Sequence, residues 1–255
     1  MMPLASFWAS SAAMMGSWMK MPSSPGWEKS SRVVNRVAER TRCFWRLAAS
    51  QPMAWIDGLD IPFAYYTESQ FFEVGRDAIS PAERITPALS RSERLWAHPG
   101  LRPVSQLQDQ PVTPMLAYRW VDTDKALNEQ LALEAEGHPA TLSPGHAAVR
   151  YTNPTNGRDV LPTIRCEMHR VRSGATTRTR REVGSSVFQV FDGQGTVKVG
   201  DHLWQVRRGD MFVVPSWQPF TAQCDAGQPS LDLFRFSDTP IFEAVHAWRE
   251  QIEPA

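Results

Sequence analysis

Cysteine is scarce in this 255-residue chain. Cys43, Cys166 and Cys224 are its three cysteines, and no two of them have CxxC spacing. An odd and widely spaced set argues against the disulfide framework of a secreted domain. We therefore expect a reducing compartment, with the cytoplasm as the predicted localisation.

The chain also has no net charge. Lys and Arg together number 27, as do Asp and Glu, so no global charge favours nucleic acid or an anionic membrane as a partner. Residues 1–19 are fairly apolar, but no basic segment precedes them and Pro, Ser and Gly interrupt them. Such a stretch favours neither a signal peptide nor a membrane span. We expect no nucleic-acid partner and no membrane partner.

The first 52 residues contain no histidine and no strand-like alternation. Met, Trp, Ser and Arg are abundant in residues 1–52, whereas Glu28 and Glu39 are the only acidic residues there. We predict an atypical N-terminal segment that is poorly ordered or weakly helical. The length of the chain still leaves room for one large domain or two small ones.

Alternating apolar and polar residues are concentrated between Gly174 and Cys224. Ser186–Phe191 and Thr196–Val199 alternate with a period of two, and a Gly-containing turn separates them. A second turn leads into the apolar run Met211–Val214, which Pro215 closes. Several short strands at this spacing predict a mainly β sandwich or barrel.

The spacing of this stretch resembles the two motifs of the cupin superfamily, a jelly-roll-like double-stranded β-helix. Gly174 and Gly193 frame the first motif, and Gly209 and Pro215 frame the second. The four positions that hold metal ligands in cupins are occupied here by Arg180, Glu182, Ser186 and Phe220. Since Arg stays protonated and Phe cannot coordinate, we predict a metal-free barrel.

Other segments resemble the gentisate 1,2-dioxygenase family and its salicylate and 1-hydroxy-2-naphthoate relatives. The string WIDGLDIP at residues 55–62 resembles W-x-D-G-L-D-x-P, which ends the N-terminal cupin of that family. LAYRW at residues 116–120 and most of residues 145–175 resemble it too. The resemblance covers about residues 53–253. It implies a bicupin oxidoreductase of aromatic-compound catabolism that uses Fe(II) and dioxygen to open gentisate to maleylpyruvate, and a homo-oligomer.

This resemblance divides the chain into parts. Residues 53–75 would be the remnant of the N-terminal cupin, residues 76–114 a linker, and residues 115–255 the C-terminal cupin with a few peripheral helices. One helix is predicted from a cap at Asp122 or Thr123 to Gly137. A terminal helix is predicted from a Thr239 cap, with its apolar face reaching Ile252.

Two carboxylates are candidate site residues by resemblance. Asp57 and Asp60 would lie near the family's iron pocket, where they could orient a histidine ligand or a substrate hydroxyl. The alternative is an Asp-Gly turn that leaves the strand. The family supplies three histidine ligands from its N-terminal cupin, and the sequence before Met53 has none.

The six histidines of the chain show no metal-binding spacing. No two are separated by two or four positions, and we interpret each as a surface or packed structural residue: His98, His138, His146, His169, His202 and His246. His146 lies in a family-like segment and is the first to test. We predict that Arg180 and Glu182 form a salt-bridged barrel lining rather than a binding site, and that Trp217 belongs to the core or to an interface.

The missing ligands make it uncertain whether the chain is an enzyme. We expect it to bind no iron and to be impaired, as an apparently truncated or frame-disrupted member of the family. We hypothesise that residues 1–52 are an out-of-frame translation; if no neighbouring frame of the DNA encodes a His-x-His strand, the idea fails. The competing idea is an authentic, divergent N-terminus. The alternative function is a non-catalytic cupin, either an oligomerising module or a binder of small ligands around Arg180 and Phe220.

Overall fold

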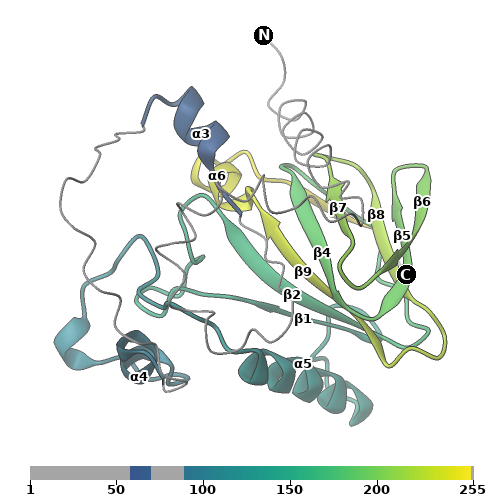
Figure 1. Ribbon diagram of the computed structural model, residues 1–255, viewed down its shortest axis with the longest axis horizontal. Helices are drawn as coiled ribbons and strands as arrows, with labels where there is room; N and C mark the ends of the chain where they lie inside the picture. Colours follow the sequence, from purple (N-terminus) through teal and green to yellow (C-terminus); the bar gives the residue numbers. More distant parts are fainter. Residues whose placement is uncertain (1–57, 70–88, 254–255) are drawn as a thin grey trace, which may run out of the picture. The chain divides into compact units, whose positions relative to one another are not determined.

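The structure is a computed structural model that describes residues 58–69 and 89–253 (Figure 1). Residues 91–253 belong to one compact unit, and residues 58–69 belong to a second unit that is described by itself. Asp57 lies outside the described residues. The larger unit contains the strands, and it carries every feature discussed below apart from helix α3.

Two antiparallel five-stranded sheets build the larger unit. The first sheet has the order β1-β2-β9-β4-β7, with bounds His146–Arg150, Arg165–Arg172, Ser230–Ser237, Ser186–Asp192 and Met211–Val214. The second has the order β10-β3-β8-β5-β6, with bounds Glu250–Ile252, Arg180–Glu182, Phe220–Cys224, Gln194–Val199 and His202–Arg207. In Figure 1 the long strands β1, β2, β9 and β4 lie side by side. The predicted mainly β fold is confirmed.

Apolar residues from both sheets meet in one core. Val190 of β4, Val197 of β5, Ala222 of β8 and Leu233 of β9 are almost fully buried and belong to one cluster. Burial alternates along β5, as the period-two pattern predicts for a strand with one face inward. The strands expected from Ser186, Thr196 and Met211 are therefore present close to their predicted bounds.

The turn between β4 and β5 requires glycine. Gly193 has a φ of +82°, a region that residues with a side chain rarely adopt, and a Cβ there would collide with the Ser230 carbonyl oxygen. The close approach of β9 thus fixes the identity of this residue. The Gly-containing turn that the sequence predicts lies where it was expected.

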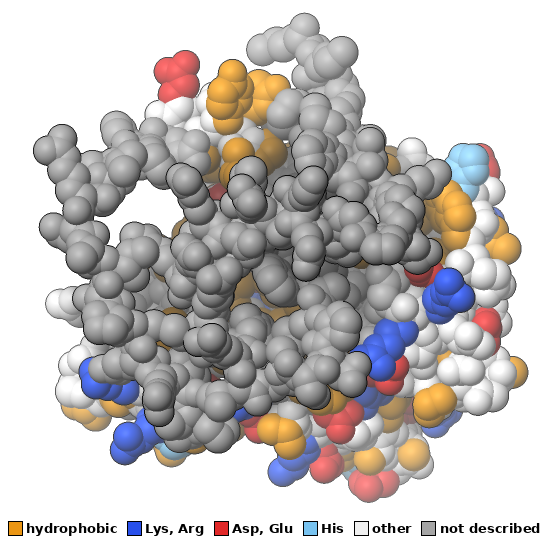
Figure 2. All heavy atoms as spheres, viewed as in Figure 1, with side chains coloured by type: hydrophobic (Ala, Val, Ile, Leu, Met, Phe, Trp, Pro, Cys, Tyr) orange, Lys and Arg blue, Asp and Glu red, His pale blue; other side chains and the backbone are white. Residues whose placement is uncertain are grey.

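Helix α5 packs against the outside of the first sheet. It runs over Trp120–Ala135, so the predicted caps Asp122 and Thr123 are wrong: they lie inside the helix, and Arg119 is its N-cap. Thr123 instead donates a hydrogen bond to the Arg119 carbonyl oxygen, 3.2 Å away. Leu127 is fully buried in a cluster with Ala147 and Met168. Along the lower edge of the view, where Figure 1 places α5, Figure 2 shows both acidic and basic side chains. α5 itself carries four acidic residues and one basic residue, Lys125.

The predicted terminal helix is wrong beyond its first turns. Helix α6 covers only Thr239–Ala244, with Asp238 rather than Thr239 at the N-cap, and the next regular element is strand β10. β10 pairs with β3 in an antiparallel ladder, Glu250 opposite Glu182 and Ile252 opposite Arg180. By pairing with the edge strand β3, β10 satisfies backbone N–H and C=O groups of both strands. This tertiary contact overrides the helical pattern of the apolar residues after Thr239.

The remaining described helices are short. α4 spans Arg91–Trp96 and the 3₁₀ helix η2 spans Val104–Gln106, both inside the segment interpreted as a linker. Glu93 and Trp96 of α4 are buried. In the second unit, α3 spans Ile61–Tyr66 with Asp60 as its N-cap residue. None of the helices in the described ranges is long and apolar enough to cross a bilayer.

Candidate functional site

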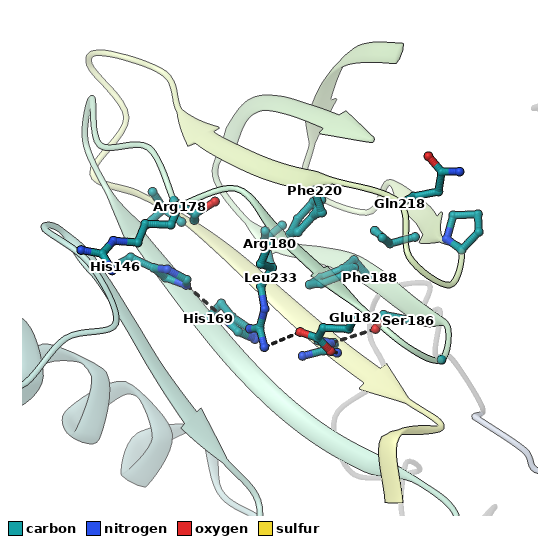
Figure 3. A pocket seen from close by; sticks show the side chains of 16 residues that line it. His146, His169, Arg178, Arg180, Glu182, Ser186, Phe188, Gln218, Phe220 and Leu233 are labelled. Atoms are coloured by element: carbon teal, nitrogen blue, oxygen red, sulfur yellow. Dashed lines mark hydrogen bonds and ion pairs between the residues drawn. The ribbon is translucent and has the colours of Figure 1, made fainter. Parts of the chain in front are cut away.

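A cavity of about 40 Å³ lies inside the barrel of the larger unit. Its polar lining comes from β1, β2, β3, β4 and β9 and from residues outside the strands, and Phe188 and Phe220 form an apolar wall (Figure 3). The two phenyl rings stack with centroids 4.7 Å apart. All four cupin ligand positions named from the sequence line this cavity: Arg180, Glu182, Ser186 and Phe220. Sequence spacing therefore located the cavity correctly.

Arg235 of β9 forms the centre of a buried ion-pair network. Its Nη1 donates to Glu167 at 2.6 Å and its Nη2 donates to Glu182 at 2.5 Å. Its Nε donates to the Ser186 hydroxyl at 3.0 Å. All three guanidinium nitrogens are thus engaged, which is the arrangement that makes a buried charge tolerable. The sequence analysis missed Arg235, since nothing in LDLFRFS marks one residue of an ordinary strand as a partner for two distant glutamates.

Arg180 lies next to this network and is only partly engaged. Its Nη2 pairs with Glu182 and with Glu250 of β10, 2.5 Å from the latter carboxylate. The predicted salt-bridged lining of Arg180 and Glu182 is confirmed. Arg180 Nε, in contrast, is buried and has no hydrogen-bond partner among the described residues.

Two histidines meet beside Arg180 in the lining of the cavity (Figure 3). His146 of β1 and His169 of β2 are both buried, and His146 Nε2 lies 3.0 Å from His169 Nδ1. Because β1 and β2 are antiparallel, with Ala148 opposite His169, the two side chains lie diagonally on one face. The residues are 23 positions apart in the chain, so a search for short spacings could not pair them. Recognising β1 and β2 as a hairpin with both histidines inward would have done so.

The surroundings of His146 disfavour a positive charge on its ring. Burial, and then the neighbouring His169 and Arg180, lower the pKa of His146 to about 3. His146 is therefore neutral at pH 7. Burial alone would raise the pKa of Glu167, but its contacts with His169 and Arg235 lower it well below the usual range. Glu167 is therefore an anion committed to Arg235.

The residues of this barrel do not fit Fe(II). In residues 58–69 and 89–253, no group of three or more His, Cys, Asp or Glu side chains is placed to hold a metal ion. Ser186 accepts a hydrogen bond from Arg235, and Phe220 is part of the apolar wall. The guanidinium groups of Arg180 and Arg235 line the cavity, and their positive charges would repel a dication placed there.

The other candidates from the sequence lie away from this cavity. Asp60 belongs to the second unit, where it precedes α3. Trp217 is 42% exposed with a φ of +64°, so it is not a core residue of the described structure. His98 and His138 lie in loops, as expected, and His202 begins β6. The prediction that His246 lies on the terminal helix is wrong, because α6 ends at Ala244.

No protein-family model matches the chain. It is 52% identical over 195 residues to a gentisate 1,2-dioxygenase of Streptomyces sp, an alignment that covers 76% of this chain and 53% of that protein. It is 30% identical over 203 residues to a 5-aminosalicylate 1,2-dioxygenase of Comamonas sp, covering 78% of this chain and 50% of that one.

A solved structure shares the fold. Salicylate 1,2-dioxygenase from Pseudoaminobacter salicylatoxidans, in a structure described as its adducts with gentisate, is 56% identical with a TM-score of 0.75. The match covers 80% of this chain and 55% of that one. The chain thus spans about half the length of the relatives it matches. By sequence and by cupin fold, the matched part of this chain is related to the gentisate 1,2-dioxygenase family.

Proposed function

We propose that the chain derives from a ring-cleaving dioxygenase that acts on gentisate or a closely related aromatic acid with dioxygen. The observation that carries this proposal is the similarity to relatives named gentisate and salicylate 1,2-dioxygenases, at 52% and 56% identity. These relatives are about twice as long as the matched region. The similarity therefore supports the reaction class, while the activity of this chain depends on residues outside the barrel described above.

The described barrel contributes stability rather than ring-cleavage chemistry in this proposal. Its interior is filled by the Arg235 network and by the stacked Phe188 and Phe220, which leave no set of metal ligands among the described residues. Iron, when bound in the family, supplies the activation of substrate and dioxygen. The sequence before Met53 contains no histidine to hold it. We infer that this chain on its own binds little iron and turns over little gentisate.

Bound iron and gentisate-dependent oxygen uptake, both measured on the purified chain, test the proposal. We expect sub-stoichiometric iron and oxygen uptake near the background rate, with the Streptomyces relative as a positive control. Turnover of gentisate with stoichiometric iron would overturn the expected impairment. Turnover of a different substrate class, such as a sugar acid, would overturn the proposed reaction class.

A second candidate function is a self-associating cupin module. Strand β6 is an edge of the second sheet, and Leu203 and Trp204 on it are 65% and 46% exposed. Exposed apolar residues on a sheet edge favour association, so we propose a homo-oligomer that uses this edge. Light scattering on the purified chain and on Leu203→Ser tests it: a monomeric parent chain, or a variant with unchanged oligomer size, contradicts this interface. Cytoplasmic localisation stays a prediction from cysteine usage.

A further inference from the structure

We propose that Asn156 deamidates spontaneously once residues 104–112, here called the arm, detach from residues 153–158, here called the turn. The product of the reaction then prevents the arm from docking again. Both segments belong to the larger unit of the structure. The reaction needs water and no metal, so the proposal does not rest on ring cleavage.

The sequence makes Asn156 chemically labile. Asn156 and Gly157 form the one Asn-Gly pair of the chain, and glycine has no side chain to hinder a reaction of its backbone nitrogen. In that reaction the Gly157 nitrogen loses its proton and bonds to the Asn156 Cγ atom. The bond from Cγ to Nδ2 breaks, and the nitrogen leaves with a proton as ammonia. Water then opens the cyclic imide to an aspartyl or an isoaspartyl residue.

Hydrogen bonds engage every reacting group while the arm is docked. The Gly157 N–H donates to the Asn153 carbonyl oxygen at 2.8 Å. The Asn156 Oδ1 accepts a hydrogen bond from the Arg158 N–H at 2.9 Å, and the Asn156 Nδ2 donates to the Gln110 carbonyl oxygen of the arm at 2.9 Å. The Gly157 nitrogen has to give up its proton, and the Asn156 side chain has to rotate towards it. The docked arm therefore protects Asn156.

The arm is held to the turn through one residue. The Gln110 N–H donates to the Thr155 hydroxyl at 3.0 Å, and the Gln110 carbonyl oxygen accepts from the side-chain amides of Asn153 and Asn156. Within the described ranges, every hydrogen bond between the arm and the turn involves Gln110. All residues of the arm are exposed. Such a segment opens at a much lower free energy than the whole fold.

Deamidation replaces a hydrogen-bond donor by an acceptor at the docking point. The Asn156 Nδ2 donates to the Gln110 carbonyl oxygen, whereas an ionised carboxylate in its place has no proton to donate and would face that oxygen. An isoaspartyl product also routes the backbone through the former side chain, which changes the geometry of the turn. With either product the arm loses this contact and stays detached.

Mass spectrometry of the purified full chain, incubated at mildly alkaline pH, tests the protection by the arm. We expect Asn156 to deamidate more slowly, by about tenfold or more, than it does in a synthetic peptide of residues 151–161, because the folded chain must first open locally. Thr155→Val removes the hydroxyl that accepts the hydrogen bond from Gln110. This variant should deamidate at Asn156 about threefold or more faster than the parent chain.

Matched variants separate the docking of the arm from general effects. Thr179→Val removes a hydrogen bond to the Thr221 hydroxyl, outside the arm and the turn, and should leave the deamidation rate of Asn156 unchanged. Asn156→Asp reproduces the charged product and should make thermolysin cut the arm faster, for example before the exposed Leu107. Asn128→Asp, at an exposed position of α5, should leave that cleavage rate unchanged.

Three results would each overturn the proposal: deamidation of Asn156 as fast in the folded chain as in the peptide, an unchanged rate in Thr155→Val, or unchanged cleavage of the arm in Asn156→Asp. Urea denaturation followed by circular dichroism measures the global stability of the two threonine variants. A faster reaction in Thr155→Val that is matched by its loss of global stability would indicate global unfolding instead, and would also overturn the proposal.

Discussion

At the scale of single residues, Arg235 is the side chain on which the interior of this barrel depends. It is 4% exposed and bridges β2, β3 and β4 through Glu167, Glu182 and Ser186. A buried pair of this kind adds little over a well-packed apolar core, but breaking it leaves uncompensated charge behind. Removing Arg235 should therefore lower the stability of the fold by more than the intact ion pairs add to it.

We predict that Arg235→Gln lowers the free energy of unfolding by about 3–5 kcal/mol, because Glu167 then loses its arginine partner and Glu182 keeps only Arg180. Urea denaturation followed by circular dichroism measures the change. The control is Arg150→Gln, at the exposed end of β1, which should shift the value by no more than about 0.5 kcal/mol. Equal changes in the free energy of unfolding for the two variants would mean that the Arg235 ion pairs do not stabilise the fold.

His146 should make stability depend on pH. Its pKa falls from 6.5 to about 3 on folding, chiefly through burial and then through His169 and Arg180. Below pH 6.5 the unfolded chain binds a proton that the folded chain refuses, so this contribution to stability is lost as pH falls from about 6.5 towards 3. Asp238 acts in the opposite sense, since burial raises its pKa from 3.8 to about 6 and the folded chain then gains stability as pH falls.

We predict that His146→Gln flattens the fall in stability between pH 6.5 and 4, where the wild-type slope includes at most about 1.4 kcal/mol per pH unit from this residue. Denaturation curves at a series of pH values test it. His202→Gln, on an exposed position of β6, should keep the wild-type slope. A His146→Gln profile parallel to that of the wild type would show that His146 is not held neutral.

At the scale of elements, the turn between β4 and β5 and the turn before β7 offer a matched pair of glycines. Gly193 and Gly209 have φ values of +82° and +93°. A Cβ at Gly193 would collide with the Ser230 carbonyl oxygen, whereas a Cβ at Gly209 would meet no heavy atom of the described residues within 4 Å. Both positions carry the same backbone penalty for a side chain. They differ only in what surrounds them.

We predict that Gly209→Ala costs about 1–2 kcal/mol of stability, the cost of left-handed backbone alone. Gly193→Ala should cost about 2–5 kcal/mol, because the collision with β9 adds an overpacking term. Thermal and urea unfolding of the two variants compare them directly. Equal losses of stability in the two variants would mean that β9 can move away from the turn without a loss of free energy.

At the scale of the whole molecule, the barrel should be indifferent to iron. Its interior is held by ion pairs and apolar packing, and its described residues offer no metal site. Ligands that bind the folded state raise stability by about 2.7 kcal/mol at a hundred times their dissociation constant. We therefore predict that the chelator-treated chain and the chain with added Fe(II) have the same melting temperature, as measured by calorimetry. A rise with Fe(II) that chelator reverses would indicate iron ligands beyond those described.

The sequence by itself determined the mainly β cupin fold, the family relationship and the position of the cavity. Period-two alternation and glycine-containing turns are local signals, and they marked β4, β5 and β7 without knowledge of their partners. Spacing from Gly174 and Gly209 brought Arg180, Glu182, Ser186 and Phe220 to one cavity wall. Asp57 lies outside the described residues, and a role for Asp60 stays a prediction.

Only the tertiary structure decided which distant residues meet. The histidine pair, the Arg235 network and the position of Arg180 Nε, which has no hydrogen-bond partner in the described ranges, each depend on strand register between segments far apart in the chain. The same holds for β10, where a helical pattern gave way to pairing with β3. Local sequence patterns predict strands and turns because the alternation of buried and exposed residues, and the turn preference of glycine, involve only neighbouring residues in the chain. Charge pairing and edge pairing are set by contacts that exist only after the sheets assemble.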